Sequence, residues 1–417
     1  MTVDRSGDDA TGGRVFTALS LSGFVVLGLP DGMWGTAWPA IRRTYHQPVG
    51  ALGLLLVAVT VGALLTSLTT SRAIRRVGAT AALTAAAVSG MCAAGLLVAV
   101  RSWLAVVGAA VLLGAAAGVL DTGLNTLVAM SGRSRLLNML HGAYGVGTAI
   151  GPVVVTGALL LGSWRPAYAV LLLLELGLGI GWACAGARRA AAPSPAREPE
   201  PEREPAAHVS AAPARHRLAT RLGVLVFFSY TGLEVTAGQW AATYLRGPIG
   251  LSAAGAGAVV FAYWGALTAG RFAVAVPRRP PAPARLVHWG TLLALGGTAL
   301  VWWHPSRAVL VLGIAVLGAS LAPVYPALVT LTPIRVGAHR ALQVIGWQVA
   351  AAGVGGAAVS ALAGLVLQRA GLSAYPPVIV AAAVVVAVSA FALERLTRAD
   401  HPAGGGRHVA VATGPPA

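Results

Sequence analysis

The stretch that decides the fold is GAAAGVLDTGLNTLVAMSGRSRLLNMLHGAYGVGTAIGP, from Gly114 to Pro152. Two apolar, glycine-rich runs flank the short basic turn Ser131–Arg135, a pattern typical of a transmembrane helical hairpin. An ionised side chain near the bilayer centre costs about 3 kcal/mol, and lipid offers buried polar groups no partner. We therefore expect the polar residues inside these runs to face a protein interior or a water-filled path. They are Asp121, Asn125, Asn138 and His141.

Helical spacing places these polar residues on one face of each helix. Asp121 and Asn125 are four residues apart, and His141 follows Asn138 by three residues and precedes Thr148 by seven. Each helix of the hairpin therefore carries one polar stripe. We expect both stripes to face the same cavity.

The composition indicates an integral membrane protein made of helices. Of 417 residues, 56% are hydrophobic and 10% are charged, and the mean hydropathy is +0.74. Soluble domains carry about 25% charged residues. The apolar runs are long enough for helices, which need about 20 residues to cross a bilayer, whereas strands of a barrel need about ten. The sequence thus predicts a lipid bilayer as its surroundings.

The positive net charge does not indicate a nucleic-acid partner. All 30 basic residues are arginine, almost all lie between apolar runs, and no basic patch is interleaved with aromatic residues. The two cysteines, Cys92 and Cys184, lie inside apolar runs, which predicts neither a disulfide nor a metal site. We expect no cofactor, and we expect the chain to act as a monomer.

The apolar runs predict twelve spans in two sets of six. A segment rich in proline and charge, residues 188–217, cannot bury a core and is predicted to be a disordered cytoplasmic linker. It separates a six-helix bundle at 15–187 from a second at 218–396, with tails at 1–14 and 397–417. The expected spans are 15–40, 50–71, 79–100, 103–130, 136–162, 165–187, 219–245, 251–276, 286–303, 307–331, 340–368 and 374–394.

The distribution of arginine predicts the orientation. With the N-terminus inside, the cytoplasmic segments hold 23 arginines and the external loops hold 7. Because cytoplasmic loops are enriched in basic residues, both termini are predicted to be cytoplasmic, in a multi-pass protein of the cell membrane.

The two predicted halves resemble each other weakly. Gly28 and Asp31, followed by Trp38, have counterparts in Gly232 and Glu234, followed by Trp240. Glycines also recur in the fifth and eleventh spans, where they permit close approach of helices. The pattern predicts an all-helical membrane protein with two parallel six-helix pseudo-repeats.

Apart from Glu394 at the end of the last span, only four acidic residues lie within the spans, and three of them are candidates for proton coupling. An acidic residue inside a membrane is functional by default, so Asp31, Asp121 and Glu234 are the candidates; Tyr230 lies one turn before Glu234. Alternatively, Asp31 caps a kink beside a proline. The fourth acid, Glu175, has no polar neighbour in sequence and is left open between a groove and a partner on another helix.

Aromatic and amide residues are candidates for substrate contacts. Trp34 and Trp38 share a helical face with Asp31, although tryptophans also anchor helices at the membrane surface. Gln343 and Trp347 are four residues apart and suit a clamp made of one amide and one ring. The predicted substrate-binding set is Trp34, Trp38, Asn125, Asn138, His141, Gln343 and Trp347, with a purely structural role left open for His141.

These motifs resemble the fucose permease type of proton-coupled sugar transporter within the major facilitator superfamily. The resemblance rests on Gly118, Asp121, Thr122 and Asn125 in the fourth span and on the Leu137-Asn138 pair, followed by a polar residue and a glycine, in the fifth. It implies that Asp31 and Asp121 take part in proton coupling and substrate binding, with Asn125, Asn138 and His141 lining the sugar site. An aspartate replaces the family's glutamate in the fourth span, and His141 stands where an amide is common.

The same superfamily carries a gating motif in the loop after the second span. Arg72, Arg75, Arg76 and Gly78 occupy this loop, and Arg271 is the corresponding fragment in the second half, but the acidic residue of the motif is missing. The positive-inside rule explains these arginines equally well. Gly147-x-x-x-Gly151-Pro152 in the fifth span resembles half of a motif found in drug:proton antiporters.

We interpret the sequence as a secondary transporter working by alternating access. The first hypothesis is proton symport of a hexose-like sugar, a small-molecule substrate. The alternative is a proton-coupled antiporter that exports a drug or metabolite, and a receptor or structural role is a distant third. No nucleophile with a base and no metal-ligand cluster is recognisable in the sequence, so an enzyme is not expected.

The predicted orientation is testable by labelling. In a variant lacking Cys92 and Cys184, single cysteines placed between Arg188 and Arg217 should resist impermeant thiol reagents in intact cells. They should react once the membrane is permeabilised. Labelling from outside the intact cell would overturn the orientation.

Overall fold

The structure, a computed structural model, is all-helical throughout the residues it describes, which are 5–131, 133–191, 214–275 and 281–398. Twelve segments within these ranges are long and apolar enough to cross a membrane, as predicted. The first half contains α1 (Arg5–Thr44), α2 (Ala51–Val77), α3 (Ala79–Ala99), α4 (Trp103–Met130), α5 (Ser134–Leu160) and α6 (Arg165–Ala191). The second half contains α7 (Ala214–Arg246), α8 (Ala253–Ala275), α9 (Pro283–Trp303), α10 (Arg307–Leu321), α11 (Val324–Val336), α12 (Ala338–Ala370), η1 (Leu372–Ala374) and α13 (Tyr375–Arg398).

One crossing is interrupted, and α10 and α11 together make it. The break falls at Ala322 and Pro323, because proline lacks a backbone N–H and clashes with the preceding helical turn. The carbonyl of Leu321, at the end of α10, accepts a hydrogen bond of 2.8 Å from the Tyr230 hydroxyl. A side chain of the same half therefore binds the backbone beside the break.

Close contacts at glycine hold the helices of each half together. In α5, a Cβ added at Gly147 would lie 1.9 Å from the carbonyl oxygen of Val25 in α1, and one added at Gly28 would lie 2.1 Å from that of Tyr144. The second half repeats the contact, because a Cβ at Gly355 in α12 would lie 2.1 Å from the Phe228 carbonyl in α7. The first and fifth crossings of each half therefore pack backbone against backbone.

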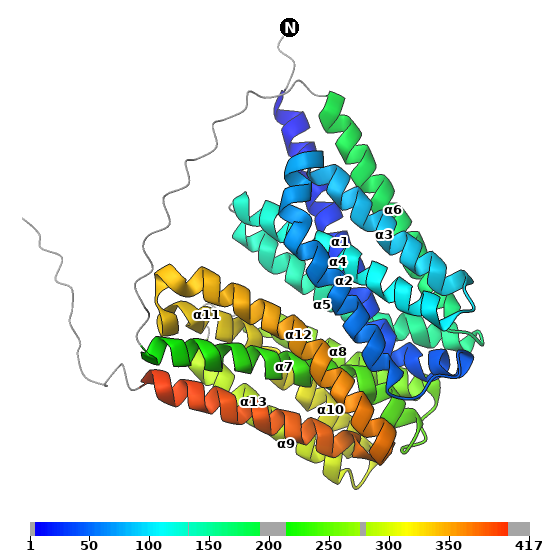
Figure 1. Cartoon of the computed structure of the whole chain (residues 1–417), viewed down its shortest axis with the longest axis vertical. Helices are drawn as coiled ribbons and strands as arrows, with labels where there is room; N and C mark the ends of the chain where they lie inside the picture. Colours follow the sequence, from blue (N-terminus) through cyan, green and yellow to red (C-terminus); the bar gives the residue numbers. More distant parts are fainter. Residues whose placement is uncertain (1–4, 132, 192–213, 276–280, 399–417) are drawn as a thin grey trace, which may run out of the picture.

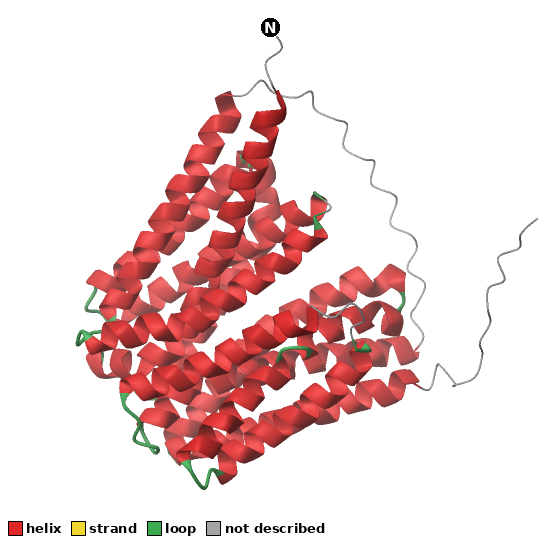
Figure 2. Cartoon of the chain, turned by 180° about the vertical axis from the view of Figure 1, so that it is seen from behind, coloured by secondary structure: helices red, strands yellow, loops and turns green. Residues whose placement is uncertain are grey.

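The two halves converge at one end and diverge at the other (Figures 1 and 2). They separate toward the ends where α1 begins and α13 ends, and meet where α1 ends and α2 begins. At the closed end, the Gly50 N–H donates to Gln368 of α12, and Gly53 packs on Ala361. Further along, Gly35 of α1 lies against the backbone of Gln239 in α7.

The predicted linker and tails fall largely outside the described residues. α6 continues to Ala191 and α7 begins at Ala214, so both helices enter the predicted 188–217 linker. Alanine and arginine favour helix, which explains the extension. α1 likewise begins at Arg5, inside the predicted 1–14 tail. Positions 1–4, 192–213 and 399–417 are not described.

The glycine contacts predict a position-specific effect of a single methyl group. Gly147→Ala should destabilise the protein by about 1–3 kcal/mol, because the added Cβ overlaps the α1 backbone. Gly157→Ala, in the same helix, is the matched control, since a Cβ there meets nothing within 4 Å. Thermal unfolding of the purified variants measures both effects; equal stability of the two would contradict this account of the packing.

Candidate functional site

Asp31 lies where α1, α5 and α7 meet. The Tyr144 hydroxyl of α5 donates to Asp31 Oδ2, and the Gln239 side chain of α7 donates to the Asp31 backbone carbonyl at 2.7 Å. The glycines around Asp31 produce this arrangement: a Cβ at Gly32 would lie 2.0 Å from the Thr148 carbonyl of α5. Asp31 is therefore bonded to both halves of the molecule.

Glu234 of α7 forms a second polar cluster in the other half. Its Oε2 lies 2.5 Å from the Tyr230 hydroxyl, and its backbone carbonyl accepts a hydrogen bond of 2.8 Å from Tyr263 of α8. Arg271 of α8 forms an ion pair with Oε1 at 3.5 Å. Arg271 was predicted as part of a gate; in the structure it contacts this carboxylate, and its gating role stays a prediction.

The two clusters are close enough to act on each other. Asp31 and Glu234 interact electrostatically, and Arg271 interacts with both Tyr144 and His141 of the first half. Two direct contacts join α5 to α8 beside them: Thr268 donates to the Gly145 carbonyl at 2.9 Å, and Phe272 packs on Gly142. The predicted proton-coupling residues Asp31 and Glu234 are thus brought together across the interface between the halves.

Asp121 lies apart from this pair, on α4. It accepts a hydrogen bond of 2.8 Å from the Asn125 side chain, whose Oδ1 is buried without a partner in the described structure. Asp121 interacts electrostatically with Tyr325, at the start of α11 in the other half. Because Tyr325 packs its ring at 6.0 Å from that of Tyr230, one chain of aromatic contacts connects the surroundings of Asp121 and Glu234.

Four of the predicted substrate-binding residues have exposed side chains. Asn138 and His141 are exposed on α5, and Gln343 and Trp347 are exposed on α12, with Trp347 at 51%. The His141 ring also makes an edge contact with Phe24 of α1, at 5.9 Å between centroids. A role in substrate binding stays a prediction for each of these residues.

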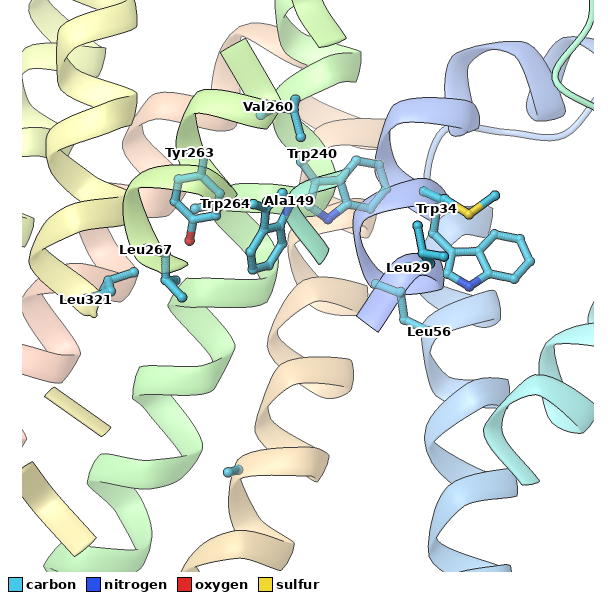
Figure 3. Close-up of a cluster of buried hydrophobic side chains, with 14 of the residues drawn as sticks. Leu29, Trp34, Leu56, Ala149, Trp240, Val260, Tyr263, Trp264, Leu267 and Leu321 are labelled. Atoms are coloured by element: carbon cyan, nitrogen blue, oxygen red, sulfur yellow. The ribbon is translucent and has the colours of Figure 1, made fainter. Parts of the chain in front are cut away.

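Trp34 and Trp38 do not lie where a substrate clamp requires them. They are 1% and 0% exposed. Trp34 packs on Tyr168 of α6, and Trp38 packs on Trp103 of α4 and donates its indole N–H to the Val49 carbonyl at 3.0 Å. Figure 3 shows Trp34 pointing away from Trp240 and Trp264 of the second half. Both rings belong to the interior of the first half in this conformation, and their role as ligand contacts stays a prediction.

The predicted gate and the remaining acid lie elsewhere. Arg72, Arg75 and Arg76 are exposed in the last turns of α2, and Gly78 has a φ of +86°, which a glycine tolerates and which ends that helix. Their gating role stays a prediction. Glu175 of α6 lies against Gly90 of α3, and its Oε2 has no hydrogen-bond partner among the described residues.

Sequence reasoning missed the phenols and one amide that organise the site. Tyr144, Tyr263 and Gln239 supply hydrogen bonds to the two acids or their backbone. A tyrosine hydroxyl in an apolar span needs a partner, so its presence near an acid in helical register was a usable signal. Within the described residues, no group of three or more His, Cys, Asp or Glu could hold a metal ion.

Comparisons with known proteins place this architecture. The family profile described as Major Facilitator Superfamily matches residues 20–288. No curated protein matches the chain. Among solved structures, a D-xylose-proton symporter is 14% identical, with a TM-score of 0.70, covering 92% of this chain and 97% of its own.

Two further solved structures share the fold at low identity. The E. coli fucose:proton symporter FucP is 15% identical, with a TM-score of 0.57 and coverage of 90% of this chain and 98% of its own. The human organic anion transporter MFSD10 is 18% identical, with a TM-score of 0.61 and coverage of 92% and 98%. Transporters of different kinds match comparably, so the similarity does not single out the fucose permease type.

The buried position of Trp38 predicts separate effects on stability and on binding. Trp38→Phe should lower the free energy of unfolding by about 0.5–1.5 kcal/mol, because the bond to the Val49 carbonyl is lost. Solute affinity should stay unchanged. Trp347→Phe is the contrasting variant for stability. Trp347 is exposed, and the substitution keeps a ring and removes no hydrogen bond found among the described residues, so the free energy of unfolding should change less than in Trp38→Phe. Calorimetry measures the change in stability, and equilibrium binding measures the solute affinity. Weaker binding by folded Trp38→Phe would contradict this expectation and support a role of Trp38 as a ligand contact.

Proposed function

The chain belongs to the major facilitator superfamily, and on that premise we propose that it is a proton-coupled symporter for a hexose-like sugar. Its class is that of a transporter and not of an enzyme. The observation that carries the proposal is the pair of acidic clusters at the interface between the halves. One cluster contains Asp31 and Tyr144, and the other contains Glu234 and Arg271. The two carboxyl groups interact electrostatically across the interface between the halves, which must rearrange during alternating access.

Protons are the natural coupling ion for such an arrangement. A buried carboxyl group is neutral when protonated and needs a partner when ionised, so gain and loss of a proton changes which contacts are favourable. Asp31 is hydrogen-bonded to α5 of its own half and to α7 of the other. The bond to α7 is made by the Asp31 backbone carbonyl, so a change in the charge of the carboxylate acts beside this contact and, across the interface, on Glu234. Asp121 is proposed as a further proton site, next to Asn125.

The amide and aromatic residues predicted to bind the solute suit a hydroxyl-rich molecule. Sugars are recognised by hydrogen bonds at the ring edge and by stacking on apolar ring faces. Asn125, Asn138 and Gln343 supply amides, and Trp347 and Tyr325 supply rings. Among the solved structures of this fold are symporters for xylose and fucose, which favours the same class of solute.

A second candidate function is export of a cationic drug or metabolite in exchange for protons. The observation that favours it is the excess of acids over bases: of the three acids Asp31, Asp121 and Glu234, only Glu234 has an ion pair with an arginine among the described residues. Release of lipophilic cations from proteoliposomes, without transport of any hexose, would select this function over symport.

We further propose an inward-facing state for the conformation described. The arginine distribution assigns both termini to the cytoplasm of a cell with the protein in its inner or plasma membrane. In that orientation, the diverging end of the two halves in Figure 1 faces the cytoplasm. The contacts of Gly50 with Gln368 and of Gly35 with Gln239 then close the external side. The protein would act as a monomer, with the whole transport path inside one chain.

A substitution at Asp121 separates proton coupling from a structural role. Asp121→Asn mimics the permanently protonated acid, so binding and the exchange of labelled for unlabelled solute should persist. Gradient-driven accumulation should vanish, because a group that cannot change charge cannot couple the two fluxes. Parallel assays of binding, exchange and uptake in proteoliposomes measure these effects.

The contrasting outcomes identify the alternatives. If binding, exchange and accumulation fall together with the amount of folded protein, Asp121 is structural. Accumulation at the wild-type level by folded Asp121→Asn would leave Asp31 and Glu234 as the coupling groups.

A further inference from the structure

Arg271 is partly exposed among acids and phenols, where its guanidinium contacts Glu234 at 3.5 Å and hydrogen-bonds Tyr230, which leaves N–H donors of the fork unused. We propose that this guanidinium binds a carboxylate on the solute, so that the transported molecule is an acidic sugar rather than a neutral one. The inference rests on the proposed function, proton-coupled transport of a hexose-like solute, and narrows its substrate class.

The ion pair between Arg271 and Glu234 is loose. Its single contact measures 3.5 Å, whereas an arginine–carboxylate hydrogen bond is about 2.7–2.9 Å and is often formed twice, side by side. A guanidinium has five N–H donors in a planar fork. Its side chain is 25% exposed, twice the 12% of Glu234. The fork therefore has both free donors and open surface.

The geometry around Glu234 shows how the arginine can be released from this partner. Tyr230 has one hydroxyl proton but two acceptors, Glu234 Oε2 at 2.5 Å and the Leu321 carbonyl at 2.8 Å. Both contacts become hydrogen bonds when Glu234 itself is protonated: the acid donates to the phenol, and the phenol donates to the carbonyl. The cluster thus accommodates a neutral Glu234.

Protonation of Glu234 leaves a positive charge between the two halves. With Glu234 neutral and Asp31 protonated beside Tyr144, Arg271 is the remaining charge of the cluster, and an anion is the ligand that balances it. The titratable groups that interact with Arg271 come from three helices. They are Glu234 and Tyr230 of α7, Tyr144 and His141 of α5, and Tyr325 of α11, joined by Tyr263 of its own helix.

Binding and coupling then follow from the same charge exchange. A proton on Glu234 weakens its hold on Arg271, and the solute carboxylate takes its place. After the solute leaves, ionised Glu234 pairs with Arg271 again and keeps the empty site neutral. One anion and at least one proton therefore move in the same direction, and affinity for the anion should increase as the pH falls.

The experiment compares acidic sugars with their neutral parents. Proteoliposomes with an inward proton gradient are assayed with D-galacturonate against D-galactose and with D-gluconate against D-glucose. We expect accumulation of an acidic member and roughly tenfold or greater loss of it in Arg271→Gln, because a charge-assisted bidentate contact disappears. Arg271→Lys should retain part of the uptake. Arg101→Gln, an exposed loop arginine, is the matched control.

A second variant tests the charge exchange independently of uptake. Glu234→Gln fixes the neutral state of this residue, so equilibrium binding of the acidic sugar should persist and depend less steeply on pH than in the wild type. Wild-type binding should tighten as the pH falls. Thermal unfolding shows whether each variant is folded. If Arg271→Gln does not fold, uptake by Arg271→Lys and the pH dependence of binding by Glu234→Gln test the inference instead.

The outcomes distinguish this inference from the proposed function. Proton-driven accumulation of a neutral sugar alone, or equal losses for neutral and acidic sugars in folded Arg271→Gln, would overturn the inference and leave sugar symport standing. Transport of neither member of either pair would end both proposals.

Discussion

The structure depends on one constraint, which is that an ionisable side chain inside a bilayer needs a partner from the protein. Unpaired charge in an apolar medium is costly, and lipid supplies no hydrogen bonds. Asp31 meets this need with Tyr144, Asp121 with Asn125, and Glu234 with Tyr230 and Arg271. These partners come from different helices in two of the three cases. The polar contacts therefore contribute to how the helices are arranged.

Close helix packing makes these polar contacts possible. Without the glycines of α1 and α5, Tyr144 would not reach Asp31, since their helices touch backbone to backbone at Gly28, Gly32 and Gly147. The same device recurs between α7 and α12, where Gly355 meets Phe228. The glycines thus bring the helices close together, and the acids form polar contacts between them. At the contact between the halves, a close glycine contact and a polar contact occur together. Gly35 lies against the backbone of Gln239, and the Gln239 side chain donates a hydrogen bond to the backbone carbonyl of Asp31.

Much of the fold could be predicted from the sequence because membrane-spanning helices have long apolar runs that are easily recognised. Each crossing needs about 20 apolar residues, and the repeated runs located all twelve. The break between α10 and α11 lies inside a run that was predicted as one span. Helix ends were less accessible: α6 and α7 extend into the predicted linker, since alanine and arginine continue a helix beyond the membrane.

The site could be predicted only in part, because sequence spacing gives the face of one helix and not its neighbour. The acids Asp31 and Glu234 were found from their rarity in the spans, and Asp121 with Asn125 from their spacing. Trp34 and Trp38 share a face with Asp31 in sequence, yet that face packs on α4 and α6. Arg271 was assigned from its repeat position, whereas its partner Glu234 comes from another helix. Such pairings require the tertiary structure.

The central claim is that protons and solute move together through the acids between the halves. The most direct measurement records internal pH and solute entry in the same proteoliposomes, with no gradient imposed at the start. Any solute that enters should carry protons with it and acidify the interior, and a protonophore should abolish its accumulation against a gradient. Solute entry without acidification, or accumulation that survives the protonophore, would contradict the account.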